Sequence, residues 1–223
     1  MKKAETSNAN KSERLITYPI LFWIFMIGNV AGFILEGLWH VLIRGYWESM
    51  PATVWGPFSL VYGVGAVLLY LVAIPLKKKN FFIQFMTFAL VGSTLEYGVS
   101  LFQEIFFGSK SWNYSHHFMN LNGRISLPMA LIWGGLGLLF VKLIFPPLTK
   151  LLLKMQGKGW RVACVVTSVY MALNLSTTAS ALLRWGERLD MEPPSSYWEE
   201  YLDKVYNDER MRENYPTMYF FED

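Results

Sequence analysis

The sequence predicts an all-α membrane protein, a polytopic bundle of about five spans followed by a C-terminal amphipathic helix. Three observations predict it: long apolar runs, an internal repeat, and basic residues sorted into alternate connections. Of 223 residues, 53% are hydrophobic and 17% are charged, whereas a soluble domain carries about a quarter charged residues. A spanning helix needs about 20 mostly apolar residues. The chain supplies five such runs, over residues 16–43, 58–76, 81–107, 127–145 and 161–183.

The first run follows a polar segment, residues 1–14, which we expect to be a flexible cytoplasmic tail. It is much longer than the roughly 7–15 residues of a signal-peptide core. We therefore expect it to remain as a membrane anchor. The first and third runs exceed a minimal span, so we expect them to tilt or to project beyond the lipid.

The first four runs form a tandem repeat of a two-helix unit, and the transmembrane bundle as a whole covers residues 15–185. Residues 31–36 (AGFILE) in the first run are echoed by residues 91–96 (VGSTLE) in the third. Each copy thus places a carboxylate, Glu36 or Glu96, inside its first helix. Ionisable groups inside membrane segments are costly and mark candidate functional sites.

The second and fourth runs carry the other half of the repeat. Residues 55–60 (WGPFSL) precede the second run as residues 122–127 (NGRISL) precede the fourth, and the runs then contain Tyr62-Gly63 and Trp133-Gly134. The connecting loops, about 44–57 and 108–126, are rich in Trp, Tyr, Asn and Gly. Their glycines allow the backbone to dip back into the bundle, which is tolerated only where protein or a wet cavity surrounds it.

Basic residues cluster before the first run and around alternate connections: Lys2, Lys3, Lys11 and Arg14; Lys77, Lys78 and Lys79; Lys142, Lys150, Lys154, Lys158 and Arg161. The other two loops hold only Arg44, Lys110 and Arg124. The positive-inside rule places the N-terminus and the lysine-rich connections in the cytoplasm. An odd number of spans then places the C-terminus outside the plasma membrane. Because topology explains the lysines, we expect no nucleic-acid partner.

After the fifth run, residues 186–223 form an acidic extracytoplasmic tail. Pro193-Pro194 excludes a continuing helix, and Ser196 with Glu199 fits a capping box. Apolar residues then recur at spacings of three and four, which predicts an amphipathic helix over about 197–213. Two interpretations stay open. Either the helix lies on the bundle or the membrane interface, or it forms a lid over the loops at about 44–57 and 108–126, which we call the far-side loops.

The candidate binding site is built on Glu36, Glu96 and Arg124, which topology places in one leaflet. An arginine can offer a planar fork to one or both carboxylates. His40 lies one turn from Glu36 on the same face, whereas Glu104, near the end of its helix, is expected to face water. The cluster is either an ion pair that joins the two repeats or a pocket in which Arg124 holds an anionic group and a carboxylate transfers a proton.

Trp55, Asn113 and Asn122, from the far-side loops, complete the candidate binding set. We assign no catalytic residue, cofactor or metal. The adjacent His116 and His117 have no partners at zinc-like spacing. The single cysteine, Cys164, excludes an intrachain disulfide.

Several spaced motifs resemble one family over roughly residues 18–185. They are Gly-x-x-x-Glu in the first run, Trp55-Gly56-Pro57, Glu96-Tyr97, Trp112-Asn113-Tyr114-Ser115, Asn122-x-Arg124-Ile125 and Trp133-Gly134. The chain resembles the CmpB-like family labelled putative ABC-transporter type IV permeases, in which Asp often stands where this chain has Asn113. The resemblance implies the membrane half of an ATP-driven transporter, with a separate ATPase subunit as partner. Only residues 146–160 offer such a subunit a cytoplasmic surface, and five spans are few enough that we expect an oligomer.

The favoured hypothesis is a permease subunit, surrounded by membrane lipids, that binds or moves a small or lipid-like solute through the Glu36, Glu96 and Arg124 pocket. One alternative is an intramembrane enzyme acting on a lipid head group, with either Glu36 or Glu96 as general base. The other is a structural or regulatory subunit without a ligand.

Overall fold

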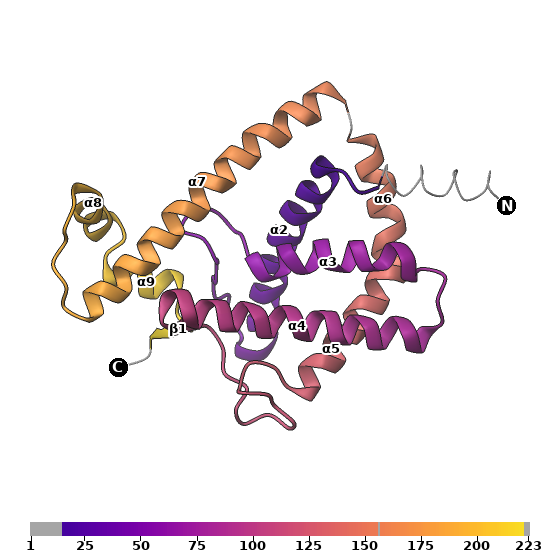
Figure 1. Ribbon diagram of the computed structural model, residues 1–223, viewed down its shortest axis with the longest axis horizontal. Coiled ribbons are helices and arrows are strands. Elements are labelled where there is room, and N and C mark those ends of the chain that lie inside the picture. The colour runs from indigo at the N-terminus through magenta and orange to yellow at the C-terminus, as the bar shows by residue number, and fades with distance from the viewer. Residues whose placement is uncertain (1–14, 156, 221–223) are drawn as a thin grey trace.

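The computed structural model describes residues 15–155 and 157–220 and shows an all-α bundle (Figure 1). Four helical segments are long and apolar enough to cross a membrane: α2 (Tyr18–Arg44), α4 (Phe81–Phe107), the continuous rod Leu127–Lys154, and α7 (Lys158–Leu189). A shorter apolar helix, α3 (Leu60–Leu76), has 17 residues. The predicted membrane bundle is confirmed. The expected tail over residues 1–14 lies outside the described residues.

The two halves of the repeat are helical hairpins, α2 with α3 and α4 with the first part of the rod, α5 (Leu127–Leu139). In both hairpins a glycine lies under an aromatic ring of the partner helix. A Cβ atom at Gly32 would overlap the ring of Tyr62, and one at Gly92 would overlap the ring of Trp133. The repeat seen in sequence is therefore a repeat of packing, because small residues let helix backbones approach closely in membranes.

At one further position of this packing, the two hairpins differ in which helix carries the large side chain. In the first hairpin, Gly28 on the leading helix faces Ala66. In the second, Phe88 occupies the leading helix and Gly137 on α5 makes room for its ring. The large side chain is thus admitted by a small residue directly opposite, which keeps the interior filled.

The loop between α2 and α3 returns into the bundle before α3 begins. The N–H of Ser59, the residue before α3, donates to the carbonyl of Asn29 at 3.1 Å. Asn29 lies fifteen residues before the end of α2, or about 22 Å along the helix axis. The loop backbone at this depth is bound by α7: the Val54 N–H donates to Thr178 Oγ1 at 3.0 Å. Protein groups therefore replace water for this buried backbone, as membrane burial requires.

The rod Leu127–Lys154 contains a π-helical turn, η1 (Phe140–Ile144), between α5 and α6 (Phe145–Lys154). Pro146 and Pro147 follow at once. Proline has no N–H to donate and crowds the preceding turn. The π turn absorbs this interruption, with the Phe145 N–H donating to the Phe140 carbonyl. The helix therefore continues to Lys154, past residue 145 where we expected the fourth span to end.

The main apolar core lies toward the lysine-rich end of the bundle. It gathers buried side chains from α2, α3, α4 and the rod: Ile20, Ile24, Leu69, Tyr70, Ala73, Phe88, Phe140, Val141, Phe145 and Leu152. The start of α2, the α3–α4 turn, α6 and the start of α7 share this end, with the C-terminal tail at the other (Figure 1).

The tail folds as two short helices, α8 (Tyr197–Val205) and α9 (Asp208–Asn214), where we expected one helix over about 197–213. The break occurs because the Asn207 side chain accepts the Arg210 N–H and so starts a new helix. Ser196 caps α8 by accepting the Glu199 N–H.

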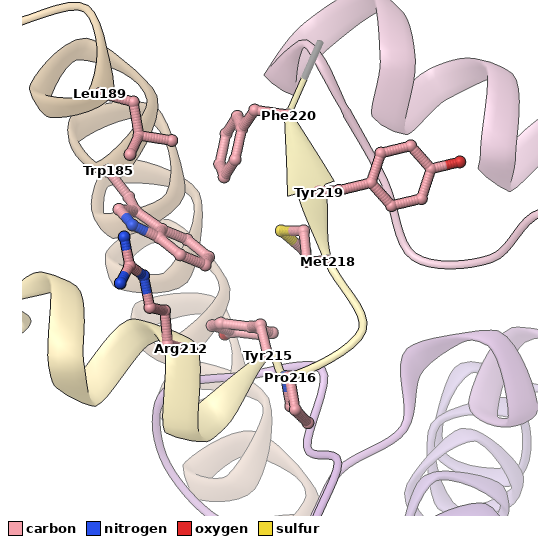
Figure 2. Close-up of a pocket in the computed structure, with 8 residues that line it drawn as sticks. All are labelled: Trp185, Leu189, Arg212, Tyr215, Pro216, Met218, Tyr219 and Phe220. Atoms are coloured by element: carbon pink, nitrogen blue, oxygen red, sulfur yellow. The ribbon is translucent and has the colours of Figure 1, made fainter.

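The tail packs on the end of α7 and on both far-side loops. Its apolar side chains form a second core with Val54 and α7: Ala181, Leu182, Trp185, Leu202, Tyr206, Met211 and Tyr215. Strand β2 (Tyr219–Phe220) pairs antiparallel with β1 (Ser109–Lys110). Trp185 of α7 and Phe220 of β2 pack edge to face, with ring centres 5.0 Å apart, and both line a pocket of about 420 Å³ (Figure 2).

Candidate functional site

Glu96 lies inside the second hairpin and is held by two hydrogen bonds from outside its own helix. The Tyr114 hydroxyl donates to Oε1 at 2.8 Å, and the Trp133 Nε1–H donates to Oε2 at 3.0 Å. The residue is only 7% exposed. Because Trp133 also covers Gly92, one indole ring both packs the hairpin and binds its carboxylate.

Glu36 is the equivalent carboxylate of the first hairpin and is half-buried. Its Oε2 accepts a hydrogen bond from the Ser59 hydroxyl at 3.3 Å. Ser59 immediately precedes α3, so the carboxylate lies beside the start of that helix. Helix N-termini carry partial positive charge and favour a nearby carboxylate.

Two tyrosines lie within range of the negative charges of both carboxylates. The charges of both Glu36 and Glu96 act on the Tyr62 hydroxyl. Burial raises the pKa of Tyr114, and the negative charges of Glu96 and Glu36 raise it further. Tyr114 therefore stays protonated and donates to Glu96. We refer to Glu36, Ser59, Tyr62, Glu96, Tyr114 and Trp133 as the two-carboxylate cluster.

Arg124 does not join this cluster, contrary to the expected pairing with Glu36 or Glu96. Its guanidinium donates to Glu104 at 2.5 Å, and Lys110 pairs with the same carboxylate at 2.9 Å. Glu104 lies eight residues beyond Glu96 on α4, about 12 Å further along the axis. At that height the loop supplies both cations, so Glu104 is ion-paired and about one-third exposed.

Asn122 and Arg124 meet at Tyr97. The Asn122 side-chain amide donates to the Tyr97 hydroxyl at 2.9 Å, and the Arg124 guanidinium lies over the Tyr97 ring, 5.6 Å from its centre. The hydrogen bond to Glu104 raises the pKa of Arg124 above its ordinary value. This second group, which we call the outer ion cluster, thus contains Tyr97, Glu104, Lys110, Asn122 and Arg124.

The loop over residues 109–126 is folded on itself and places Tyr114 against Glu96. The Tyr114 N–H donates to the Gly123 carbonyl at 2.7 Å, and the Trp112 Nε1–H donates to the Arg124 carbonyl at 3.1 Å. Gly123 has φ +66°, and a Cβ there would lie 2.6 Å from Ser115 Oγ. The Trp112–Ser115 and Asn122–Ile125 motifs are therefore two parts of one structural unit.

Asn113 supports this loop and does not contact the carboxylates. Its Oδ1 accepts the Ser115 N–H at 2.9 Å and the Ser115 hydroxyl at 2.5 Å. Such a turn needs only a side-chain oxygen two residues before the donor. An aspartate would supply the same acceptor, so the asparagine preserves the turn.

The remaining candidates also bond elsewhere. His40 Nδ1 lies 3.1 Å from a carboxylate oxygen of Glu48. The Trp55 Nε1–H donates to the Tyr206 hydroxyl at 2.7 Å, which attaches the first loop to the tail. Among residues 15–155 and 157–220, no group of three or more His, Cys, Asp or Glu side chains could hold a metal ion.

Sequence reasoning did not assign Ser59, Tyr62, Tyr114 and Trp133 to the site. The signal was present for two of them: Tyr62 and Trp133 precede the matched glycines Gly63 and Gly134 in the repeat. Tyr114 gave no such signal, because its place at Glu96 depends on how the loop folds against Gly123.

A comparison with known protein families gives a match. The model of the CmpB family, described as putative ABC-transporter type IV, matches residues 23–179. The matched region begins within α2, covers the rest of both hairpins and every residue of the two-carboxylate cluster, and ends before the tail. No curated protein and no solved structure matches the chain.

Proposed function

Because the chain belongs to the CmpB family of putative ABC-transporter type IV proteins, we propose that it is a permease subunit whose two-carboxylate cluster binds a small or lipid-like solute. The chain is a multi-pass membrane protein of the family described as putative ABC-transporter type IV. In transporters built from internal repeats, solute sites typically lie where the repeats meet. Glu36 and Glu96 come from the two repeats and act on the same tyrosines.

One observation carries the proposal: the two carboxylates have no cationic partner in the described part of the chain, where Arg124 pairs with Glu104 instead. Acidic groups inside a membrane bundle usually pair with a cation or line a solute path. A solute that brings an ammonium group or several hydroxyl groups would compensate both acids. The geometry therefore favours a cationic or hydroxyl-rich solute over an anionic one held by Arg124.

Both carboxylates have acceptor positions that no protein donor in the described residues uses, and such a solute could bond to them. A carboxylate offers about four acceptor positions. Glu96 receives one bond on each oxygen, and Glu36 receives one from Ser59. Tyr62 and Tyr114 can each donate or accept. A solute with two or more donors can therefore be bound between the two hairpins.

The family assignment carries the partner proposals. A separate ATPase subunit would dock on the lysine-rich end, where α6 and the start of α7 are exposed over much of residues 146–160. We further propose an oligomer in the plasma membrane, with the N-terminus in the cytoplasm and the tail outside. The tail packs on both far-side loops, which supports placing the tail and these two loops on the same side of the membrane.

Native mass spectrometry of the purified protein beside Glu36→Gln/Glu96→Gln tests the site. We expect the wild type to retain a small molecule and the double variant to bind it at least roughly tenfold more weakly, because bonds to charged acceptors are lost. Glu48→Gln is the matched control, since Glu48 lies in the first loop and pairs with His40 and Arg44 near the end of α2. If the double variant retains the same molecule, or only melts at a lower temperature, the carboxylates are a structural clasp.

A further inference from the structure

A groove of about 650 Å³ opens at the lysine-rich end, between the α3–α4 turn and the kinked rod. Lys77 and Lys78 line it from the turn, Lys142 from η1 and Lys150 from α6. Pro146 and Thr149 complete the wall, and the buried side chains of Val141 and Phe145 form an apolar floor. The groove therefore joins the two repeats on the side away from the tail.

The π turn explains how the rod presents two lysines to one groove. Eight residues make about 2.2 turns of a regular α-helix, so Lys142 and Lys150 would point in different directions, about 80° apart. A π turn places more residues in each turn. Because η1 contains Lys142 and ends just before α6, its wider winding takes up part of that difference. The π turn thus shapes the groove.

The charge of the groove is uncompensated within the described residues. None of the four lysines forms an ion pair with an Asp or Glu there, and all four are exposed. Four cations over an apolar floor are complementary to an anion that carries an apolar part. On the rod beside Lys142, Leu143 and Ile144 are exposed and extend the apolar surface beyond the groove.

We propose that this groove binds the phosphate head group of an anionic phospholipid, with its acyl chain along the exposed surface of the rod. Basic pockets between membrane helices are suited to such head groups, because lysine donates to phosphate oxygens and its stem covers apolar surface. Lysines that only set the orientation of the protein in the membrane could lie anywhere in the cytoplasmic connections. These four surround a single apolar floor. A bound head group would link the α3–α4 turn, which connects the two repeats, to η1 and α6 of the rod.

The test is native mass spectrometry in detergent, titrating phosphatidylglycerol or phosphatidylcholine with identical acyl chains. We expect the wild type to prefer phosphatidylglycerol and Lys78→Gln/Lys142→Gln to lose roughly thirtyfold in its affinity for that lipid. Lys79→Gln/Lys154→Gln removes the same charge at the same end but outside the groove, so it should show no comparable loss. Lys78→Arg/Lys142→Arg, which keeps both charges, should retain the preference.

Three results would overturn the proposal. The first is an equal loss in both glutamine double variants, which would indicate diffuse charge. The second is equal binding of the two lipids by the wild type. The third is displacement of phosphatidylglycerol by inorganic phosphate at the concentrations at which the lipid itself binds, which would indicate a site for the free anion.

Discussion

At the scale of single residues, Asn174 shows how one amide side chain lets a loop enter the bundle. It is fully buried near the middle of α7. Its Oδ1 accepts the Trp55 N–H at 3.2 Å, and its amide donates to the Trp55 carbonyl at 2.7 Å. A buried backbone group without a partner is costly. Asn174 is the partner of the Trp55 N–H, and it shares the Trp55 carbonyl with the Thr53 hydroxyl. Sequence alone marks Asn174 only as a polar residue within a span.

Replacing Asn174 by alanine should destabilise the protein, because it leaves the Trp55 N–H without its partner. The Trp55 carbonyl loses one of its two bonds and keeps the one from the Thr53 hydroxyl. We expect a cost of about 1–3 kcal/mol for the unpaired N–H, measured as a lower unfolding temperature in detergent. Thr167→Ala is the control, since Thr167 donates only to the Ala163 carbonyl of its own helix. Equal losses in the two variants would contradict this role of Asn174.

At the scale of elements, the tail is attached through arginines of α7. Arg184 is 2% exposed and donates to both oxygens of Asp203 on α8, at 2.8 and 2.9 Å. Arg188 donates to Asp203 and to Asp208, each at 2.7 Å. Both helices of the tail are therefore bound to α7 by charge-assisted bonds as well as by apolar packing. Because the tail also bonds Trp55, it contacts the far-side loops directly.

The attachment of the tail should depend on pH. The hydrogen bond from Arg184 lowers the pKa of Asp203 below its ordinary 3.8. The ion pair of Asp203 therefore stabilises the folded tail fully at pH values above the pKa that Asp203 has in the unfolded chain. This stabilisation is lost as the pH falls through the lower pKa that Asp203 has in the folded protein. Relative to the intrinsic exchange rate, which itself rises with pH, the protection of α8 from hydrogen exchange should be full at pH 5 and above. It should decrease only when the pH falls below about 4.

Asp203→Asn should give fast exchange of α8 at neutral pH as well, since it weakens the bonds from Arg184 and Arg188. Glu209→Gln, at an exposed position of α9, should exchange as the wild type does. Slow exchange of α8 in Asp203→Asn would show that apolar packing alone holds the tail.

At the scale of the whole molecule, the two ends of the bundle differ in chemistry. One end carries the lysines of the α3–α4 turn and of α6, around the groove. The other end carries the tail, bound to both far-side loops by the Trp55–Tyr206 bond and the β1–β2 pair. An odd number of spans between the start of α2 and the tail is consistent with this separation.

This arrangement predicts opposite reactivity of two introduced cysteines. In intact cells, a membrane-impermeant maleimide should label Lys204→Cys in the tail and should label Lys79→Cys only after lysis. The native Cys164 is 1% exposed and should stay unlabelled in both variants, which provides the background control. Labelling of both introduced cysteines before lysis, or of the Lys79 variant alone, would contradict the proposed orientation.

The spans, the repeat and the family could be read from the sequence because each depends on local composition or on short motifs. A spanning helix requires a continuous apolar run, so the positions of the helices can be predicted from the positions of these runs in the sequence. Glu36 and Glu96 stood out because a carboxylate in such a run is rare. The repeat also aligns Gly32 with Gly92, and the structure covers each of them with a ring of the partner helix.

Only the tertiary structure decided which groups meet. Arg124 reaches Glu104 and not Glu96 because ion pairing depends on the height and rotation of helices far apart in the chain. Tyr114 reaches Glu96 because its loop folds against Gly123. The continuation of the rod through η1 depended on a π turn that composition does not reveal. Composition determines which segments enter the membrane, whereas packing determines which polar groups find partners there.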